Sequence, residues 1–151
     1  MNKKENITEQ LKTLIGEYGF NIDTLSKYLE LSPETIKDLS QGNVDVLPNE
    51  PFYRFNIFNK ISFLYFSAIE DKDLKLSAFL RVLISHHKLS KKTIAKMAGI
   101  EISDIERLIS DPPKAVTDEI KYKAAVTVMA LRFFLKECEP TTQQPNTEIN
   151  R

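Results

Sequence analysis

Basic side chains gather in the second half of this chain of 151 residues. Between Ser77 and Lys136 the sequence carries 11 Lys and Arg residues against six Asp and Glu residues, a net charge of +5. The first 60 residues carry seven basic and nine acidic residues, a net charge of −2, although the whole chain is neutral. Because lysine and arginine neutralise phosphates, an acidic partner such as a nucleic acid is expected to bind the second half.

Other kinds of site find little support in the sequence. No glycine-rich phosphate loop of the form GxGxxG or GxxxxGK[ST] occurs among the four glycines. The single cysteine, Cys138, excludes an internal disulfide and a zinc cluster, and fits a reducing compartment. We interpret His86 and His87, adjacent on a helix, as part of a solvated face, since their side chains point about a third of a turn apart. The sequence therefore predicts no enzyme, no cofactor and no metal site.

The chain resembles itself when it is shifted by 69 positions. Segment 11–15 (LKTLI) then falls on segment 80–84 (LRVLI), and 24–27 (TLSK) falls on 93–96 (TIAK). Apolar residues coincide at the helical spacings i, i+3 and i+4 over nearly thirty positions. This pattern predicts two tandem copies of one helical unit, at residues 1–69 and 70–138. The polar, proline-containing segment 139–151 is predicted to be a disordered tail.

Each copy is predicted to hold three short helices and one long helix. The short helices are expected at 7–18, 22–30 and from 33 onward in the first copy, and at 76–88, 91–99 and about 102–109 in the second. The long apolar helices are expected at about 51–69 and 117–137. The first long helix is crowded with aromatic residues, which favours a buried core helix on which both units pack. An exposed aromatic face used for dimerisation is the alternative.

The second and third short helices of each copy have the residue types of a helix-turn-helix. The motif needs a small residue where the helices cross, a glycine in the turn, and apolar residues pointing inward from the last helix. The second copy supplies Ala95, Gly99, Ile105 and Leu108, whereas the first has Glu30 in place of the glycine. The predicted fold is therefore all-α, with two tandem helix-turn-helix units of about 8–10 helices packed into one compact, pseudo-duplicated bundle.

Together with the Ser40-Gln41-Gly42-Asn43 segment after its third helix, the first copy resembles the phage repressor or Cro-like family, also called the xenobiotic-response-element type. The resemblance covers about residues 7–69, and a more degenerate one covers 76–137. It implies that the third helix of a copy reads base edges in the major groove while the start of its second helix anchors a phosphate.

The resemblance assigns candidate DNA-binding residues position by position. The anchor position falls on Ile22, which cannot bind a phosphate, and on Lys91, with Lys92 and Lys96 nearby. The base-reading positions include acidic and apolar residues in the second copy, at Glu101, Ile102 and Glu106. The nucleic-acid-binding residues that we predict are Asn21, Ser32, Pro33, Glu34, Thr35, Lys37, Lys91, Lys92, Lys96, Ser103 and Arg107.

The function implied by the resemblance is a cytoplasmic transcriptional regulator that binds double-stranded DNA as a homodimer. One of the long helices, 51–69 or 117–137, would form the dimer contact. The alternative is a protein-interaction module, such as an antirepressor or adaptor, that has lost operator binding. Ile22 at the anchor and the acids Glu101, Asp104 and Glu106 favour this alternative. A weaker third hypothesis is a small-ligand sensor with a pocket beside the aromatic helix. No membrane segment is expected.

Overall fold

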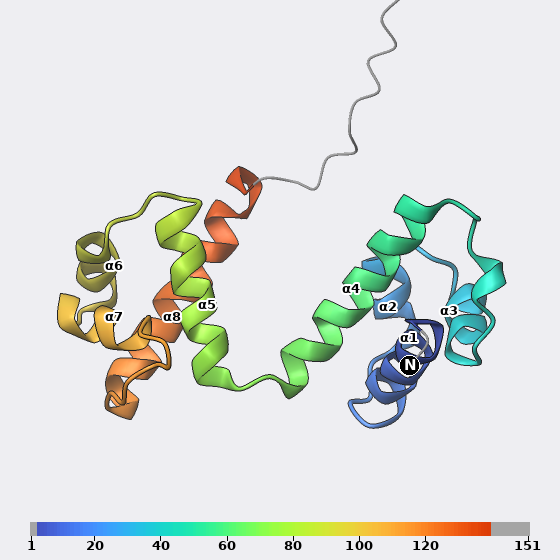
Figure 1. The fold of residues 1–151 in the computed structure, drawn as a ribbon, viewed down its shortest axis with the longest axis horizontal. Coiled ribbons are helices and arrows are strands. Elements are labelled where there is room, and N and C mark those ends of the chain that lie inside the picture. Colours follow the sequence, from blue (N-terminus) through green and yellow to red (C-terminus); the bar gives the residue numbers. More distant parts are fainter. Residues whose placement is uncertain (1–2, 140–151) are drawn as a thin grey trace, which may run out of the picture. The chain divides into compact units, whose positions relative to one another are not determined.

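The computed structural model describes residues 3–139, which form eight α-helices and two 3₁₀ turns (Figure 1). No strand occurs in this range, so the predicted all-α fold is confirmed. The chain divides between Glu70 and Asp71 into two compact units. None of the helices in the described range has the length and apolar character needed to span a membrane. Residues 140–151 of the predicted tail lie outside the described range.

The first unit contains α1 (Lys3–Gly16), α2 (Ile22–Leu29), α3 (Pro33–Ser40), the turn η1 (Val44–Val46) and α4 (Pro51–Ile69). Polar side chains fix where α2 and α3 begin, as the sequence predicts, whereas α1 begins four residues before the helix predicted at 7–18 and ends two residues earlier. The Asn21 Oδ1 atom accepts a hydrogen bond from the Asp23 backbone N–H at 2.7 Å, which caps α2. Ser32 caps α3 in the same way, and Pro33 occupies the first helical position, where a missing N–H costs nothing.

The second unit contains α5 (Lys72–Ser85), α6 (Lys91–Ala98), α7 (Ile102–Leu108), α8 (Asp118–Leu135) and the turn η2 (Lys136–Cys138). Helices α5 and α6 match α1 and α2 at a shift of 69, since residue 3 falls on 72 and residue 22 falls on 91. The helix predicted at 76–88 begins earlier, because the Asp71 side chain accepts from the backbone N–H groups of Asp73 and Leu74 at 2.9 and 3.0 Å.

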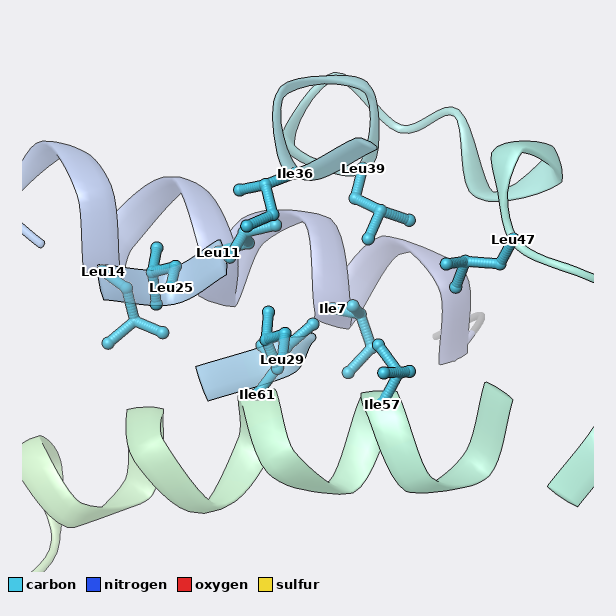
Figure 2. Packing of buried hydrophobic residues seen from close by; sticks show 10 residues of the cluster. All are labelled: Ile7, Leu11, Leu14, Leu25, Leu29, Ile36, Leu39, Leu47, Ile57 and Ile61. Atoms are coloured by element: carbon cyan, nitrogen blue, oxygen red, sulfur yellow. The ribbon is translucent and has the colours of Figure 1, made fainter. Parts of the chain in front are cut away.

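Each unit has its own hydrophobic core. In the first unit, side chains of α2, α3 and α4 surround the inner face of α1 (Figure 2). This core consists of Ile7, Leu11, Leu14, Leu25, Leu29, Ile36, Leu39, Leu47, Ile57 and Ile61. The second core consists of Leu76, Leu80, Leu83, Ile94, Ala95, Ile105, Leu108, Ala124 and Val128. A fully buried leucine or isoleucine contributes about 1.5–3 kcal/mol of transfer free energy, so these residues determine how the short helices are placed.

Helix α4 is not buried on all sides, and the prediction that it would be is wrong. Only Ile57 and Ile61, one turn apart, are buried, and both belong to the core of the first unit. Phe55 and Phe63 point to other sides of the helix and remain 51% and 67% exposed. The aromatic residues of α4 are spread around the helix, so one packing face cannot cover them all. The packing of both units into a single bundle stays a prediction.

Candidate nucleic-acid interface

In both units the second and third helices are joined through a residue with left-handed backbone. Glu30 has φ 54° and ψ 43°, and Gly99 has φ 70° and ψ 39°. The next N–H returns to the preceding helix in each case, from Leu31 to the Ser26 carbonyl at 3.1 Å and from Ile100 to the Ala95 carbonyl at 3.0 Å. A non-glycine residue in this conformation costs about 1–2 kcal/mol, and the first unit nevertheless keeps the turn with Glu30.

Two lysines of α6, the helix that precedes Gly99, present positive charge to solvent. Lys92 and Lys96 are exposed, and neither takes part in an ion pair within residues 3–139. Lys91 is half-buried, and its Nζ atom lies 4.0 Å from a carboxylate oxygen of Glu106. Ser90 caps the helix by accepting from the Thr93 N–H at 3.0 Å. The partial positive charge of the α6 N-terminus adds to that of the lysines, so this surface attracts anions.

Helix α7 exposes two of the predicted DNA-binding residues, Ser103 and Arg107, which are four positions apart and therefore lie on one face. Asp104, by contrast, is 8% exposed, and its Oδ2 atom accepts from the Glu101 backbone N–H at 3.0 Å. This carboxylate therefore caps the helix and does not face a partner. Glu106 is partly neutralised by Lys91. The acidic character of α7 is thus weaker on its exposed face than its sequence suggests.

In the first unit, most of the predicted contact residues already have a local role. The hydroxyls of Ser32 and Thr35 lie 2.8 Å apart, and Ser32 also caps α3. Asn21 caps α2, and Pro33 has no N–H to donate. Only the other two predicted readers of α3 keep exposed polar groups without a side-chain partner in the described part of the chain, namely Glu34 and Lys37.

The phosphate anchor of the first unit is absent for a structural reason. Ile22 is half-buried and packs against the core of the first unit. The next residue, Asp23, is exposed and acidic, whereas the matching residue of α6 is Lys92. The unit as a whole has seven basic and ten acidic residues up to Glu70, a net charge of −3. The charge of the first unit is therefore unfavourable for contact with phosphates.

A polar cluster that the sequence did not indicate joins the end of α8 to α5. The interpretation of His87 as a solvated residue is wrong, because its side chain is 6% exposed and its Nε2 atom lies 3.2 Å from Glu139 Oε1. The Arg132 Nε atom lies 2.8 Å from the same oxygen, and the Arg132 guanidinium lies over the Phe79 ring at 4.9 Å. Partial burial raises the pKa of Glu139, but His87 and Arg132 outweigh it and lower the pKa overall.

No motif in the sequence indicates this cluster, because Glu139 lies 52 positions from His87 along the chain and belongs to the segment 139–151 predicted to be disordered. Its role is structural, since it fixes the end of η2 against α5 and α8. No group of three or more metal-binding side chains gathers anywhere in residues 3–139.

Comparison with known proteins identifies the family. The model of a family described as a helix-turn-helix domain matches residues 2–141, a span that includes both units. No curated protein and no solved structure matches the chain. With the left-handed turn, the capped helices and the separate cores in place, this match is sufficient: the chain belongs to the helix-turn-helix domain family.

Proposed function

We propose that the protein is a DNA-binding transcriptional regulator whose second unit contacts DNA. One observation carries the proposal: Lys92 and Lys96 are exposed and without an ion pair in the described range, beside a helix-turn-helix whose last helix exposes Arg107. Phosphate neutralisation by such residues supplies most of the affinity of a DNA-binding protein. The family supports DNA binding in general.

The mechanism follows from the positions of these residues. Helix α7 enters the major groove, while the lysines and the N-terminus of α6 bind the phosphates at its edge. Arg107 is then the residue that reads a base, because a guanidinium pairs bidentately with guanine, and Ser103 accompanies it on the same face. No catalytic step and no cofactor take part. A homodimer presents two α7 helices about one turn of DNA apart, which suits a palindromic operator.

We also propose that the two units are tandem copies of one helix-turn-helix unit of the phage repressor or Cro-like type. The shift of 69 residues supports this, because over the first three helices of each unit it aligns the helix starts and the fully buried residues. The long helices α4 and α8 do not align in this way, since the buried Ile57 falls on the exposed Val126. The first copy keeps the frame but has Ile22 and Asp23 where the second has lysines. In this scheme the first copy has lost its phosphate contact.

The first unit also favours a second candidate function, that of a protein-interaction module such as an antirepressor or adaptor. Its net charge is −3, and its long helix exposes Phe55 and Phe63. Exposed aromatic side chains are typical of protein interfaces, and acidic residues at the helix-turn-helix disfavour DNA. An apolar contact of this kind changes little with salt, unlike a contact with phosphates.

Fluorescence anisotropy with random-sequence duplex DNA tests the proposal. Affinity is expected to fall as salt rises, with a slope of the logarithmic plot of about −0.9 for each phosphate neutralised. The double variant Lys92→Glu, Lys96→Glu is expected to abolish this binding. The matched control is Lys27→Glu, Lys37→Glu in the first unit, which makes the same change in charge at exposed sites, since residue 27 falls on residue 96 at the shift of 69.

Each outcome has a distinct meaning. Loss of binding in the second-unit variant, with little change in the control, supports the proposal. Loss in the control alone moves the DNA contact to the first unit. Absence of salt-dependent binding by the unmodified protein at about 20 mM salt, where electrostatic attraction is least screened, overturns the proposal and favours the interaction module. Circular dichroism of both variants checks that their helices are intact.

A further inference from the structure

Helix α8 carries two apolar stripes on opposite faces. Ala124 and Val128 are fully buried, and Leu131 and Leu135 pack partly buried against the same core. A second stripe lies two residues away along the helix, about 200° around it, and faces solvent. Its exposed fractions are 70% for Tyr122, 44% for Val126, 61% for Met129 and 77% for Phe133.

The spacing of the exposed stripe is that of a helix-pairing seam. Its four residues are separated by four, three and four positions, the a/d pattern of a heptad repeat. We propose that this stripe binds a second copy of the same chain, with the two α8 helices side by side and antiparallel. The contact would be symmetric, so that the same surface of each copy faces the other.

Size complementarity supports an antiparallel pair. A two-fold axis between Val126 and Met129 places Tyr122 opposite Phe133 of the second copy, and Val126 opposite its Met129. The large aromatic rings then meet at the two ends of the seam, and the smaller side chains meet in the middle. A parallel pair in register would instead place each residue opposite the same residue of the second copy. The two valines would then face each other between pairs of larger side chains and would fill the seam poorly.

Charge complementarity selects the same orientation. The residues that continue this spacing at each end are Glu119 on α8 and Lys136, the first residue of η2, and both are exposed. In the antiparallel pair Glu119 faces Lys136 of the second copy at both ends, whereas a parallel pair places glutamate against glutamate and lysine against lysine. Glu119 lies 3.1 Å from Lys123 on its own helix, but an exposed pair of this kind contributes little and does not hold Glu119 in place.

The area available is sufficient for a specific dimer. Phe134 adjoins the stripe, is 75% exposed, and contacts the Phe133 ring edge to face at 5.5 Å. Three aromatic side chains, each able to bury about 150–250 Å², together with Val126 and Met129 offer roughly 600 Å² per copy. Specific interfaces begin at about 1,200 Å² in total, or about 600 Å² on each side.

This inference rests on the proposed function in one respect, because the dimer supplies the two copies of α7 that a palindromic operator needs. Its test uses no DNA, so each can fail while the other stands. A monomer that still binds duplex DNA in a salt-dependent way would overturn the dimer alone. A dimer that binds no DNA would overturn the regulator alone.

Sedimentation equilibrium of the full chain is the first experiment. The unmodified protein is expected to dimerise at about 1–50 µM, the range of a small apolar interface. The variant Met129→Glu buries a charge in the seam and is expected to raise the dissociation constant about a hundredfold. Phe63→Glu on α4, at a residue of comparable exposure, is the matched control and is expected to leave it unchanged.

A monomer at about 200 µM would overturn the proposal, and so would a dimer that Phe63→Glu dissociates while Met129→Glu does not. Both substituted residues are exposed, so neither variant is expected to unfold, and circular dichroism checks this.

Charge reversal tests the orientation. Glu119→Lys is expected to weaken the antiparallel dimer about tenfold, since two attractive contacts become repulsive, and adding Lys136→Glu is expected to restore it. In a parallel dimer Glu119 faces Glu119 and Lys136 faces Lys136, so each substitution replaces one like-charged pair with another and the dissociation constant is expected to stay the same. Cys138, the only cysteine, is exposed and accepts a spin label. The label-to-label distance is expected to be about 30 Å along the antiparallel pair, at 1.5 Å per residue, and a distance near 10 Å would overturn the antiparallel orientation.

Discussion

The two units share one frame of helices but differ in the charges on its surface. Their fully buried side chains coincide at the shift of 69 in the pairs Leu11 and Leu80, Leu14 and Leu83, Leu25 and Ile94, Ile36 and Ile105, and Leu39 and Leu108. The first two residues of the second helix differ, with the half-buried Ile22 and the exposed Asp23 in one unit and the half-buried Lys91 and the exposed Lys92 in the other. A few buried residues therefore maintain the frame, and its surface is free to change partner.

The left-handed residues show the same division between frame and side chain. Besides Gly42, which has positive φ in the first unit only, two such positions match between the units: Gly19 and Glu30 in the first fall on Lys88 and Gly99 in the second. Each unit has glycine at one of the two positions, but not at the same one. The left-handed backbone is thus retained at Glu30 and Lys88, although neither residue is glycine, and the packing of the helices compensates for the strain.

The largest test of this comparison removes one matched core residue from each unit. Leu14→Ala and Leu83→Ala, both at fully buried positions, are each expected to lower the free energy of unfolding of their own unit by about 2–5 kcal/mol. Native-state hydrogen exchange is expected to show the loss of protection in the substituted unit only, because the two cores are separate. Equal loss in both units would mean that they unfold as one.

The second test gives the first unit a charge that the second unit has. Asp23→Lys, at the position that matches Lys92, is expected to add a phosphate contact and steepen the salt dependence of DNA binding by about 0.9. With this slope, one added phosphate contact raises the affinity for DNA about tenfold at tens of millimolar salt relative to its effect at 1 M salt. Glu17→Lys makes the same change in charge outside the helix-turn-helix. If both variants bind DNA equally well in anisotropy titrations, the position of the charge does not matter, and the difference between Asp23 and Lys92 does not explain how the two units differ in DNA binding.

A third test sharpens the comparison of the turns. Gly99→Ala is expected to cost about 1 kcal/mol, because left-handed backbone is unfavourable for alanine while the unfolded chain becomes less flexible. Apart from the two chain neighbours of Gly99, no residue has a heavy atom within 4 Å of the added Cβ, so the cost comes from the backbone alone. Glu30→Ala is expected to change little, since a residue with a Cβ already stands there. Urea denaturation measures both, and similar effects of the two substitutions would contradict this account.

The smallest expected effect concerns Glu139, whose partners His87 and Arg132 fall on Tyr18 and Phe63 at the shift of 69, so the cluster has no counterpart in the first unit. Its pKa in the fold is lowered, so the ionised carboxylate stabilises the fold above the ordinary pKa near 4.5, and this contribution disappears as the pH falls through the lowered value. Glu139→Gln is therefore expected to destabilise the protein by less than about 1 kcal/mol at pH 7, and the difference is expected to vanish once the pH falls below the lowered pKa of Glu139. Glu137→Gln is the control, and a pH-independent difference for Glu139→Gln would contradict the assignment.

The sequence was sufficient to predict the turns and the starts of the second and third helices of each unit, because caps such as Asn21, Ser32 and Ser90 act on backbone atoms two or three residues away. The first helix of each unit begins four residues before its predicted start. It was not sufficient where the outcome depends on contacts between distant segments. The pairing of His87 with Glu139 links residues 52 positions apart. The periodicity of α8 contains both of its stripes, but only tertiary packing decides that Val128 is covered and Met129 is not.

The exposed stripe of α8 also has a spectroscopic consequence. The protein has no tryptophan and five tyrosines, four of which lie in the first unit, so Tyr122 is the only native fluorophore of this kind in the second unit. It stands on the surface where the second copy is expected to bind, with 70% of its area open to solvent. Dimerisation through α8 can therefore be followed without a label, because it shields Tyr122 from iodide. The quenching of tyrosine fluorescence by iodide is expected to decrease as the protein concentration rises, and the variant Tyr122→Phe is expected to lose this concentration dependence.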